Sequence, residues 1–185
     1  MQQAWRTGSA TLNGKHYQVE NAIVRPLPLQ EGGIPTWIAG GGEKVTLKIA
    51  AKYAQYTNFA GAPEEFSAKS ELLRQHTLAV GTDFDAIVRS SNYNTVIGST
   101  EAEVADRIDA IEARVAPFLG KRTETFMSEY RSGKALCVGT PEQVVERLND
   151  MKSRGLGYAI NYFPEAAYDR SGMDLFAREV IPALA

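Results

Sequence analysis

Short apolar segments alternate with amphipathic helical patterns along most of this chain, and the alternation limits the folds open to it. The clearest example follows Pro35, where the apolar run 36–39 is stopped by three glycines and a helical pattern starts at Glu43. We expect strands at 36–39, 56–59, within 86–97 and at 158–163, with helices from residues 43, 63, 100 and 173. Because parallel neighbours need a crossover that is usually a helix, this order predicts an α/β fold with a parallel sheet.

The length of the chain sets the extent of that sheet. A complete (β/α)8 barrel has eight strand–helix units and typically needs about 250 residues, whereas this chain has 185 residues and four units. We therefore predict a partial TIM-type barrel of about four parallel strand–helix units. We treat 1–185 as a single domain in which residues 1–34 are an irregular or extended lead-in.

Two of the expected helices begin with capping boxes. Thr100 and Glu103 form one, and Thr140 and Gln143 form the other, with Pro141 in the favoured first helical position. We expect the first of these helices to end at Pro117 and the second near residue 155. The polar stretch 120–133 between them is predicted to be an excursion with one short helix.

The composition excludes several classes of function. The 20 Lys and Arg residues nearly balance the 22 Asp and Glu residues, so nothing drives association with a nucleic-acid backbone. No apolar stretch approaches the roughly 20 residues that span a bilayer, and the first residues lack the order of a signal peptide. The single cysteine, Cys137, excludes an internal disulfide, and the two histidines make a zinc site improbable. We expect a cytoplasmic protein.

The glycine turn at 40–42 is the most informative local feature. Consecutive glycines let the backbone approach an anion closely, and the first N–H groups of a following helix would point at a bound phosphate. A structural turn that needs positive φ explains the same glycines equally well, so spacing alone leaves both interpretations open. The turn has neither the G-x-G-x-x-G order of dinucleotide sites nor the Lys-Ser/Thr ending of a P-loop.

Few other residues suggest chemistry. His76 lies in a polar part of an expected helix and is interpreted as solvated, and Cys137 as a small buried residue. Asn58, Asn161 and Arg89 lie in or beside expected strands, where they could line a barrel mouth. The sequence has no carboxylate pair, metal-binding motif or nucleophile triad that we can recognise, so the catalytic residues stay unknown.

The order of several soft motifs resembles that of the luciferase-like monooxygenase family. They are Trp5, GKHY at 14–17, ENA at 20–22, Pro26-x-Pro28-x-Gln30, PTWIAGGGEK at 35–44, AAKYA at 50–54 and VGTPEQ at 138–143. The similarity extends over nearly the whole chain and is greatest to the deazaflavin-dependent branch. Where relatives often have Asp-Gly-Trp-Asn, this chain has Gln-Tyr-Thr-Asn at 55–58, so a role tied to that Asp or Trp is not carried over.

The resemblance implies the C-terminal half of a barrel and a cofactor. It implies hydride transfer to or from a small organic substrate with coenzyme F420, or alternatively with FMN. The residues matching the family's cofactor-tail site are Ala39, Gly40, Gly41 and Gly42, with Ala60 and Gly61 as weaker matches; no metal is implied.

Three hypotheses about activity stay open. The first is an F420- or FMN-dependent oxidoreductase whose barrel is completed by a homodimer or by another half-barrel, because exposed strand edges are costly. The second is a truncated, catalytically silent half-barrel that keeps the phosphate site. The third is a partner-binding module that docks on another protein.

Overall fold

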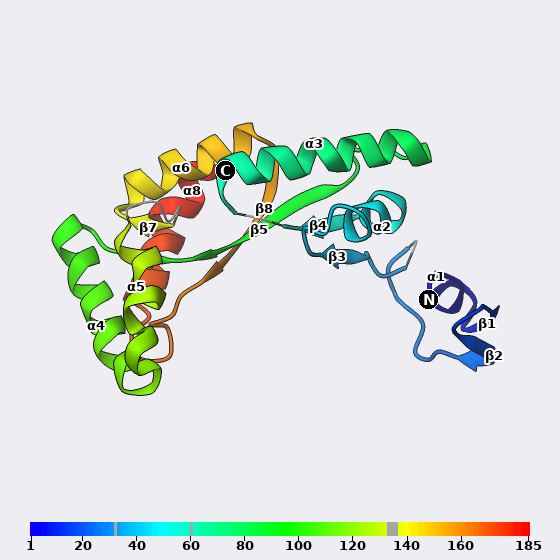
Figure 1. Cartoon of the computed structure of the whole chain (residues 1–185), viewed down its shortest axis with the longest axis horizontal. Helices are drawn as coiled ribbons and strands as arrows, with labels where there is room; N and C mark the ends of the chain where they lie inside the picture. Colours follow the sequence, from blue (N-terminus) through cyan, green and yellow to red (C-terminus); the bar gives the residue numbers. More distant parts are fainter. Residues whose placement is uncertain (32, 60, 133–136) are drawn as a thin grey trace. The chain divides into compact units, whose positions relative to one another are not determined.

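A computed structural model of the protein describes residues 1–31, 33–59, 61–132 and 137–185. The chain divides into two compact units, Met1–Thr36 and Trp37–Ala185. The larger unit carries the four expected strand–helix units, and Figure 1 shows its elements coloured along the sequence.

The smaller unit is more regular than the irregular or extended lead-in that we expect for 1–34. It has a short helix, α1 (Gln2–Thr7), followed by an antiparallel hairpin of β1 (Ser9–Asn13) and β2 (Gln18–Ile23). Gly8 ends α1 with a φ of 80° and an N–H that donates to the Ala4 carbonyl. Such a left-handed residue after a helix favours glycine, which is why the helix stops there.

The larger unit is built on a four-stranded parallel sheet in the order β3–β4–β5–β8. Its strands are β3 (Trp37–Ala39), β4 (Tyr56–Asn58), β5 (Val88–Asn94) and β8 (Leu156–Tyr162). A second parallel pair, β6 (Val96–Ile97) and β7 (Val138–Gly139), extends beyond β5. Figure 1 shows the long strands β5 and β8 side by side. This confirms the predicted α/β fold and its partial (β/α)8 barrel.

Helices connect these strands as the sequence predicts. They are α2 (Thr46–Tyr53), α3 (Pro63–Val80), α4 (Glu101–Leu119), α5 (Thr123–Arg131), α6 (Pro141–Ser153), α7 (Ser171–Leu175) and α8 (Ile181–Leu184), with a 3-10 turn, η1 (Gly120–Arg122), and a π-helical turn, η2 (Phe176–Val180). Buried side chains of α2, α3 and α6, among them Leu47, Phe66 and Leu148, form one core with residues of β5 and β8. A smaller core joins α4, α5, β6 and β7.

Three helix boundaries differ from the expectation. The last helix begins with α7 at Ser171 rather than at residue 173. Helix α2 begins at Thr46 rather than Glu43, because Val45 has a non-helical φ of −123° and the residues before it form a turn. Helix α4 does not end at Pro117 but continues to Leu119. A proline so close to a helix C-terminus removes only one backbone hydrogen bond of the last turns, so the helix can accommodate it.

Candidate functional site

The glycine turn lies at the carboxyl end of β3, between that strand and α2. Gly40 has a φ of 116°, which favours glycine, and its N–H donates to the Asn58 carbonyl at the end of β4, with 2.8 Å between N and O. This N–H is therefore used by the protein itself. Ala39, the last residue of β3, is exposed beside it.

Gly41 and Gly42 are placed differently. Among the described residues, no hydrogen-bond acceptor is found for either N–H group. A Cβ on Gly42 would lie 2.8 Å from Thr46 Oγ1, a contact that real Cβ atoms do not make, so Gly42 is needed for close packing. A Cβ on Gly41 would meet ordinary contacts at 3.5 Å and beyond. The two N–H groups are available for an anion, as the phosphate interpretation requires.

The helix start contributes less to this turn than the sequence suggests. Since α2 begins only at Thr46, its first N–H groups stand four or more residues beyond Gly42. The Leu47 N–H donates to the Gly42 carbonyl at 3.0 Å, so it is used internally. An anion at this turn would therefore depend on the N–H groups of Gly41 and Gly42 more than on the helix dipole.

A lysine that the sequence interpretation missed lies over the same turn. Lys69, on α3, passes its Cε within 3.5 Å of the place where a Gly41 Cβ would be. Its Nζ forms an ion pair with Glu43 Oε1 at 2.7 Å. The Lys69 side chain is 16% exposed and that of Glu43 is 62% exposed. The hydrogen bond and charge of Lys69 hold the pKa of Glu43 below its ordinary value.

His76 also reaches this turn. Its Nε2 lies 3.0 Å from the Glu43 carbonyl oxygen, so it is not simply the solvated residue that we expect. His76 and Lys69 are seven residues apart on α3, which is two helical turns, so they share one face. That spacing predicts a shared polar face of α3, but nothing in the local sequence indicates that this face is directed at the glycine turn.

The second set of matching residues follows β4. Ala60 lies outside the described residues. A Cβ on Gly61 would lie 3.1 Å from Cε1 of Tyr93, so Gly61 permits close approach to β5. Helix α3 then starts with Glu64 and Glu65 in its first turn, where two carboxylates would repel an anion. The geometry favours a packing role for Gly61.

The open face of the sheet carries a row of polar side chains near the carboxyl ends of the strands. Asn58 Nδ2 donates to Ser90 Oγ and to Asn92 Oδ1, both at 3.0 Å. Ala39, Asn58 and Ser90 are neighbours in register. Asn58 therefore does lie at the mouth of the partial barrel, as we expect, and Asn92 is a neighbour that the sequence did not single out.

Aromatic side chains extend the same face. Trp37 stacks on Tyr56 with 4.7 Å between ring centroids and meets Tyr158 edge-on at 5.2 Å. Trp37 is 41% exposed and Tyr158 is 49% exposed. Partly exposed aromatic rings on a sheet face are typical of surfaces that contact a ligand or another protein segment.

Arg89 and Asn161 do not share this arrangement. The Arg89 guanidinium stacks on Phe84, and its Nε donates to the Gly155 carbonyl at 3.1 Å, so Arg89 has a structural role in the larger unit. Asn161 accepts a hydrogen bond from Thr95 Oγ1 at 2.9 Å, and it lies in register with the buried Tyr93. Neither residue joins the polar row of Asn58.

Cys137 is fully buried, as the sequence interpretation expects. Burial raises the pKa of its thiol to about 12, so it has no thiolate character near neutral pH.

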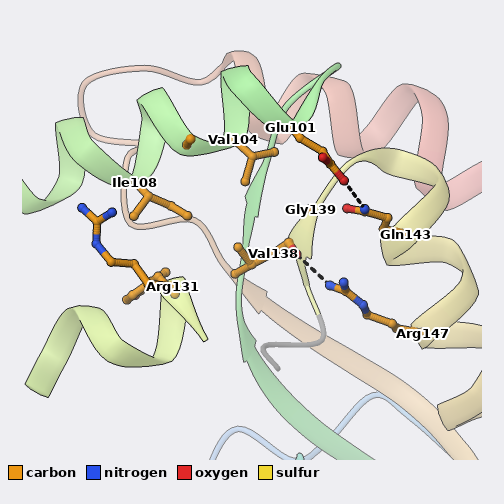
Figure 2. A pocket seen from close by; sticks show the side chains of 10 residues that line it. Glu101, Val104, Ile108, Arg131, Val138, Gly139, Gln143 and Arg147 are labelled. Carbon is orange, nitrogen blue, oxygen red and sulfur yellow. Dashed lines mark hydrogen bonds between the residues drawn. The ribbon is translucent and has the colours of Figure 1, made fainter. Parts of the chain in front are cut away.

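A separate cavity of about 380 Å³ lies between α4, α5, β7 and the start of α6 (Figure 2). Figure 2 shows Val104, Ile108 and Val138 on its apolar walls. Three of its polar side chains have partners within the protein. Gln143 Nε2 donates to Glu101 Oε1 at 2.9 Å, Arg147 donates to the Val138 carbonyl at 2.7 Å, and Arg131 pairs with Asp109 and Glu112. Glu101 and Gln143 thus link the first turns of α4 and α6.

Metal and membrane signals are both missing from the described part of the chain. No group of three or more His, Cys, Asp or Glu side chains there could hold a metal ion. None of the helices described above combines the length and the apolar character that crossing a bilayer requires.

A parallel sheet with an open glycine turn at its carboxyl edge defines an α/β protein of the barrel class with a candidate anion site. The sequence profile of the luciferase-like monooxygenase family matches residues 1–157. The chain therefore belongs to the luciferase-like monooxygenase family.

The names of two similar proteins include two different cofactors, F420 and FMNH2. The chain is 23% identical to an F420-dependent glucose-6-phosphate dehydrogenase of Mycolicibacterium smegmatis, covering 100% of this chain and 58% of that protein. It is 23% identical to an FMNH2-dependent dimethylsulfone monooxygenase of Pseudomonas fluorescens, covering 96% and 53% respectively. The chain thus spans little more than half the length of these relatives.

A solved structure supports the fold. The coenzyme F420-dependent tetrahydromethanopterin reductase of Methanopyrus kandleri is similar with a TM-score of 0.72 at 18% identity, over 100% of this chain and 60% of that one. At this identity the likeness concerns the architecture alone.

Proposed function

We propose that this chain provides the phosphate end of the cofactor site in an oxidoreductase that uses coenzyme F420, with FMN as the alternative. The observation that carries the proposal is the glycine turn itself: the N–H groups of Gly41 and Gly42 have no acceptor among the described residues, and Lys69 lies beside them. Two backbone donors and an ammonium group match the chemistry of a phosphate. Ala39 and Gly40 form the strand end that positions these donors.

The residues fit such a group in three respects. The turn is at the carboxyl edge of a parallel sheet, where ligands of open α/β sheets bind. It is accessible, since Gly40 and Gly42 are exposed. The absence of a side chain at Gly41 leaves the backbone open to close approach.

When bound, the deazaflavin or flavin would supply the hydride chemistry, and the protein would supply orientation and electrostatics. Gly41, Gly42 and Lys69 would hold the phosphate. Asn58 and Asn92, joined by a hydrogen bond on the open face, would offer polar contacts near the strand ends. We assign no catalytic residue, and the substrate is proposed only as a small organic molecule.

A titration tests the proposal. Coenzyme F420 and FMN are each added to the protein while ligand fluorescence is followed, with riboflavin as a matched control because it has the ring system of FMN without the phosphate. Saturable binding of F420 or FMN, at least tenfold tighter than that of riboflavin for the flavin pair, is the expected result. If neither phosphate-bearing cofactor binds at micromolar protein, the oxidoreductase proposal fails for this chain.

A second candidate function is a half-barrel without turnover that binds another half-barrel or another protein. It is favoured by the partly exposed aromatic cluster of Trp37, Tyr56 and Tyr158 on the open face of the sheet. Pairing of two copies would cover such a face. Light scattering tests it: a dimer mass that reverts to one chain in Trp37→Ser, still folded by circular dichroism, supports pairing. A monomer mass for the parent protein contradicts it.

A further inference from the structure

The ion pair at the glycine turn is asymmetric. Lys69 is largely buried, and its hydrocarbon stem lies along Gly41, so its ammonium group is held near the turn. The Glu43 carboxylate is 62% exposed and can turn toward water. Of the two partners, only the carboxylate can leave without disturbing the packing.

The backbone of Glu43 has its own anchor. His76 Nε2 lies 3.0 Å from the Glu43 carbonyl oxygen, and this contact does not involve the Glu43 side chain. The turn can therefore keep its course when the carboxylate moves away from Lys69. The hydrogen bond from Lys69 Nζ to Glu43 Oε1, at 2.7 Å, joins only the two side chains.

The Glu43 carboxylate is paired with the Lys69 ammonium group, which an anion at Gly41 and Gly42 would also need as a partner. A carboxylate and a phosphate oxygen are both acceptors for an ammonium donor. A phosphate at the turn would therefore compete with Glu43 for Lys69.

We propose that Lys69 is the side-chain cation of the phosphate site and that Glu43 is its resident counterion, displaced when a phosphate-bearing ligand binds. This inference rests on the proposed function and assigns its regulation to one residue. Glu43 lowers the affinity of the site for any phosphate, and it keeps the ammonium of Lys69 neutralised when the site is empty.

Substitution of Glu43 should have the opposite effect on affinity to substitution of a residue that contacts the ligand. Removing the Glu43 charge should strengthen phosphate binding, because a neutral amide oxygen competes for Lys69 less strongly than a carboxylate does. Glu43→Gln keeps the size of the side chain and an oxygen that can accept from Lys69. From the usual strength of a solvent-exposed pair, we expect phosphate to bind about three- to tenfold more tightly to this variant.

The experiment follows the backbone amides of Gly41 and Gly42 by NMR during titration with inorganic phosphate at constant ionic strength. Four proteins are compared: the parent, Glu43→Gln, Lys69→Met and Glu71→Gln. Lys69→Met keeps the stem that packs on Gly41 and removes the charge. Glu71→Gln removes one negative charge from α3 at a residue paired with Arg74, so it controls for net charge.

The expected order of affinity is Glu43→Gln, then the parent and Glu71→Gln together, then Lys69→Met. If Glu43→Gln binds phosphate as tightly as the parent does, or more weakly, the proposal that Glu43 is displaced by phosphate is overturned. The proposed function stands in that case. If phosphate shifts these amides in neither protein, the inference is also overturned. The proposed function is then judged separately, by the F420 and FMN titration.

Discussion

The turns before α2 and α4 both lead into a helix on the carboxyl side of a parallel strand, but their backbone donors are satisfied in different ways. Before α4, Thr100 Oγ1 accepts from the Glu103 N–H at 3.1 Å, and Glu103 Oε2 accepts from the Ser99 N–H at 2.8 Å. Helix α2 has no side-chain cap, and the glycines before it keep donors open. A turn that the protein caps itself is structural, and one left with open donors can bind a ligand.

The turn before α3 is a third case. Gly61 allows the chain to approach Tyr93, and the following helix starts with acidic residues. Glycine after a strand therefore permits close packing at Gly61, whereas at Gly41 we propose that it gives access to an anion. The variants below separate them, in order of decreasing free-energy effect.

Gly61→Val should destabilise the protein by about 2 kcal/mol, because the added side chain would meet the Tyr93 ring in a packed region. The measurement is urea unfolding followed by circular dichroism. Gly81→Ala is a control for the loss of a glycine: no atom lies within 4 Å of its Cβ position, so only the strain of its φ of 71° is added. A Gly61→Val protein as stable as the parent would show that this turn is not closely packed.

Gly41→Asp should weaken binding of phosphate-bearing ligands about tenfold, or about 1.4 kcal/mol, because a carboxylate would stand at the proposed site. The change in stability should be small, since a Cβ here meets only ordinary contacts. Gly41→Asn is the matched control, with the same shape and no charge. Equal affinities of the Asp and Asn variants would contradict an anion at this turn.

Thr100→Ala should cost about 1 kcal/mol of stability by removing the cap of α4. Val45→Ala is the equivalent change before α2. Val45 caps nothing and is exposed, so its substitution should change the unfolding midpoint far less. If the two variants lose the same stability, the contrast between a capped and an open turn is wrong.

The sequence predicts the parallel strand–helix order because local patterns determine it. Apolar runs, glycine turns and capping residues such as Thr100 act over a few neighbours, and the four expected strand–helix units are confirmed. The contact of Lys69 with Glu43 joins residues 26 positions apart, and no local pattern sets it. Whether Asn58 or Asn161 faces the open side depends on which parity of each strand packs on helices, and that is a property of the assembled sheet.

The smallest expected change in stability concerns Glu103, the acidic residue that caps the turn before α4. Arg107, which donates to Glu103 at 2.7 Å, and the Ser99 N–H hold the pKa of Glu103 below its ordinary value. A carboxyl group whose pKa is lower in the folded state stabilises the protein above its unfolded pKa, and that stabilisation is lost as the pH falls through the folded pKa.

Glu103→Gln should therefore lower the stability at pH 7 and lose less than the parent does between pH 6 and pH 3. Because the side chain is 37% exposed, solvent screening limits the difference to about 0.5 kcal/mol. Unfolding curves at several pH values measure it, with Asp106→Asn on the same helix as the control. If the parent and Glu103→Gln have parallel pH profiles, the Glu103 carboxylate adds nothing to the cap of α4, and the capped turn depends on Thr100 alone.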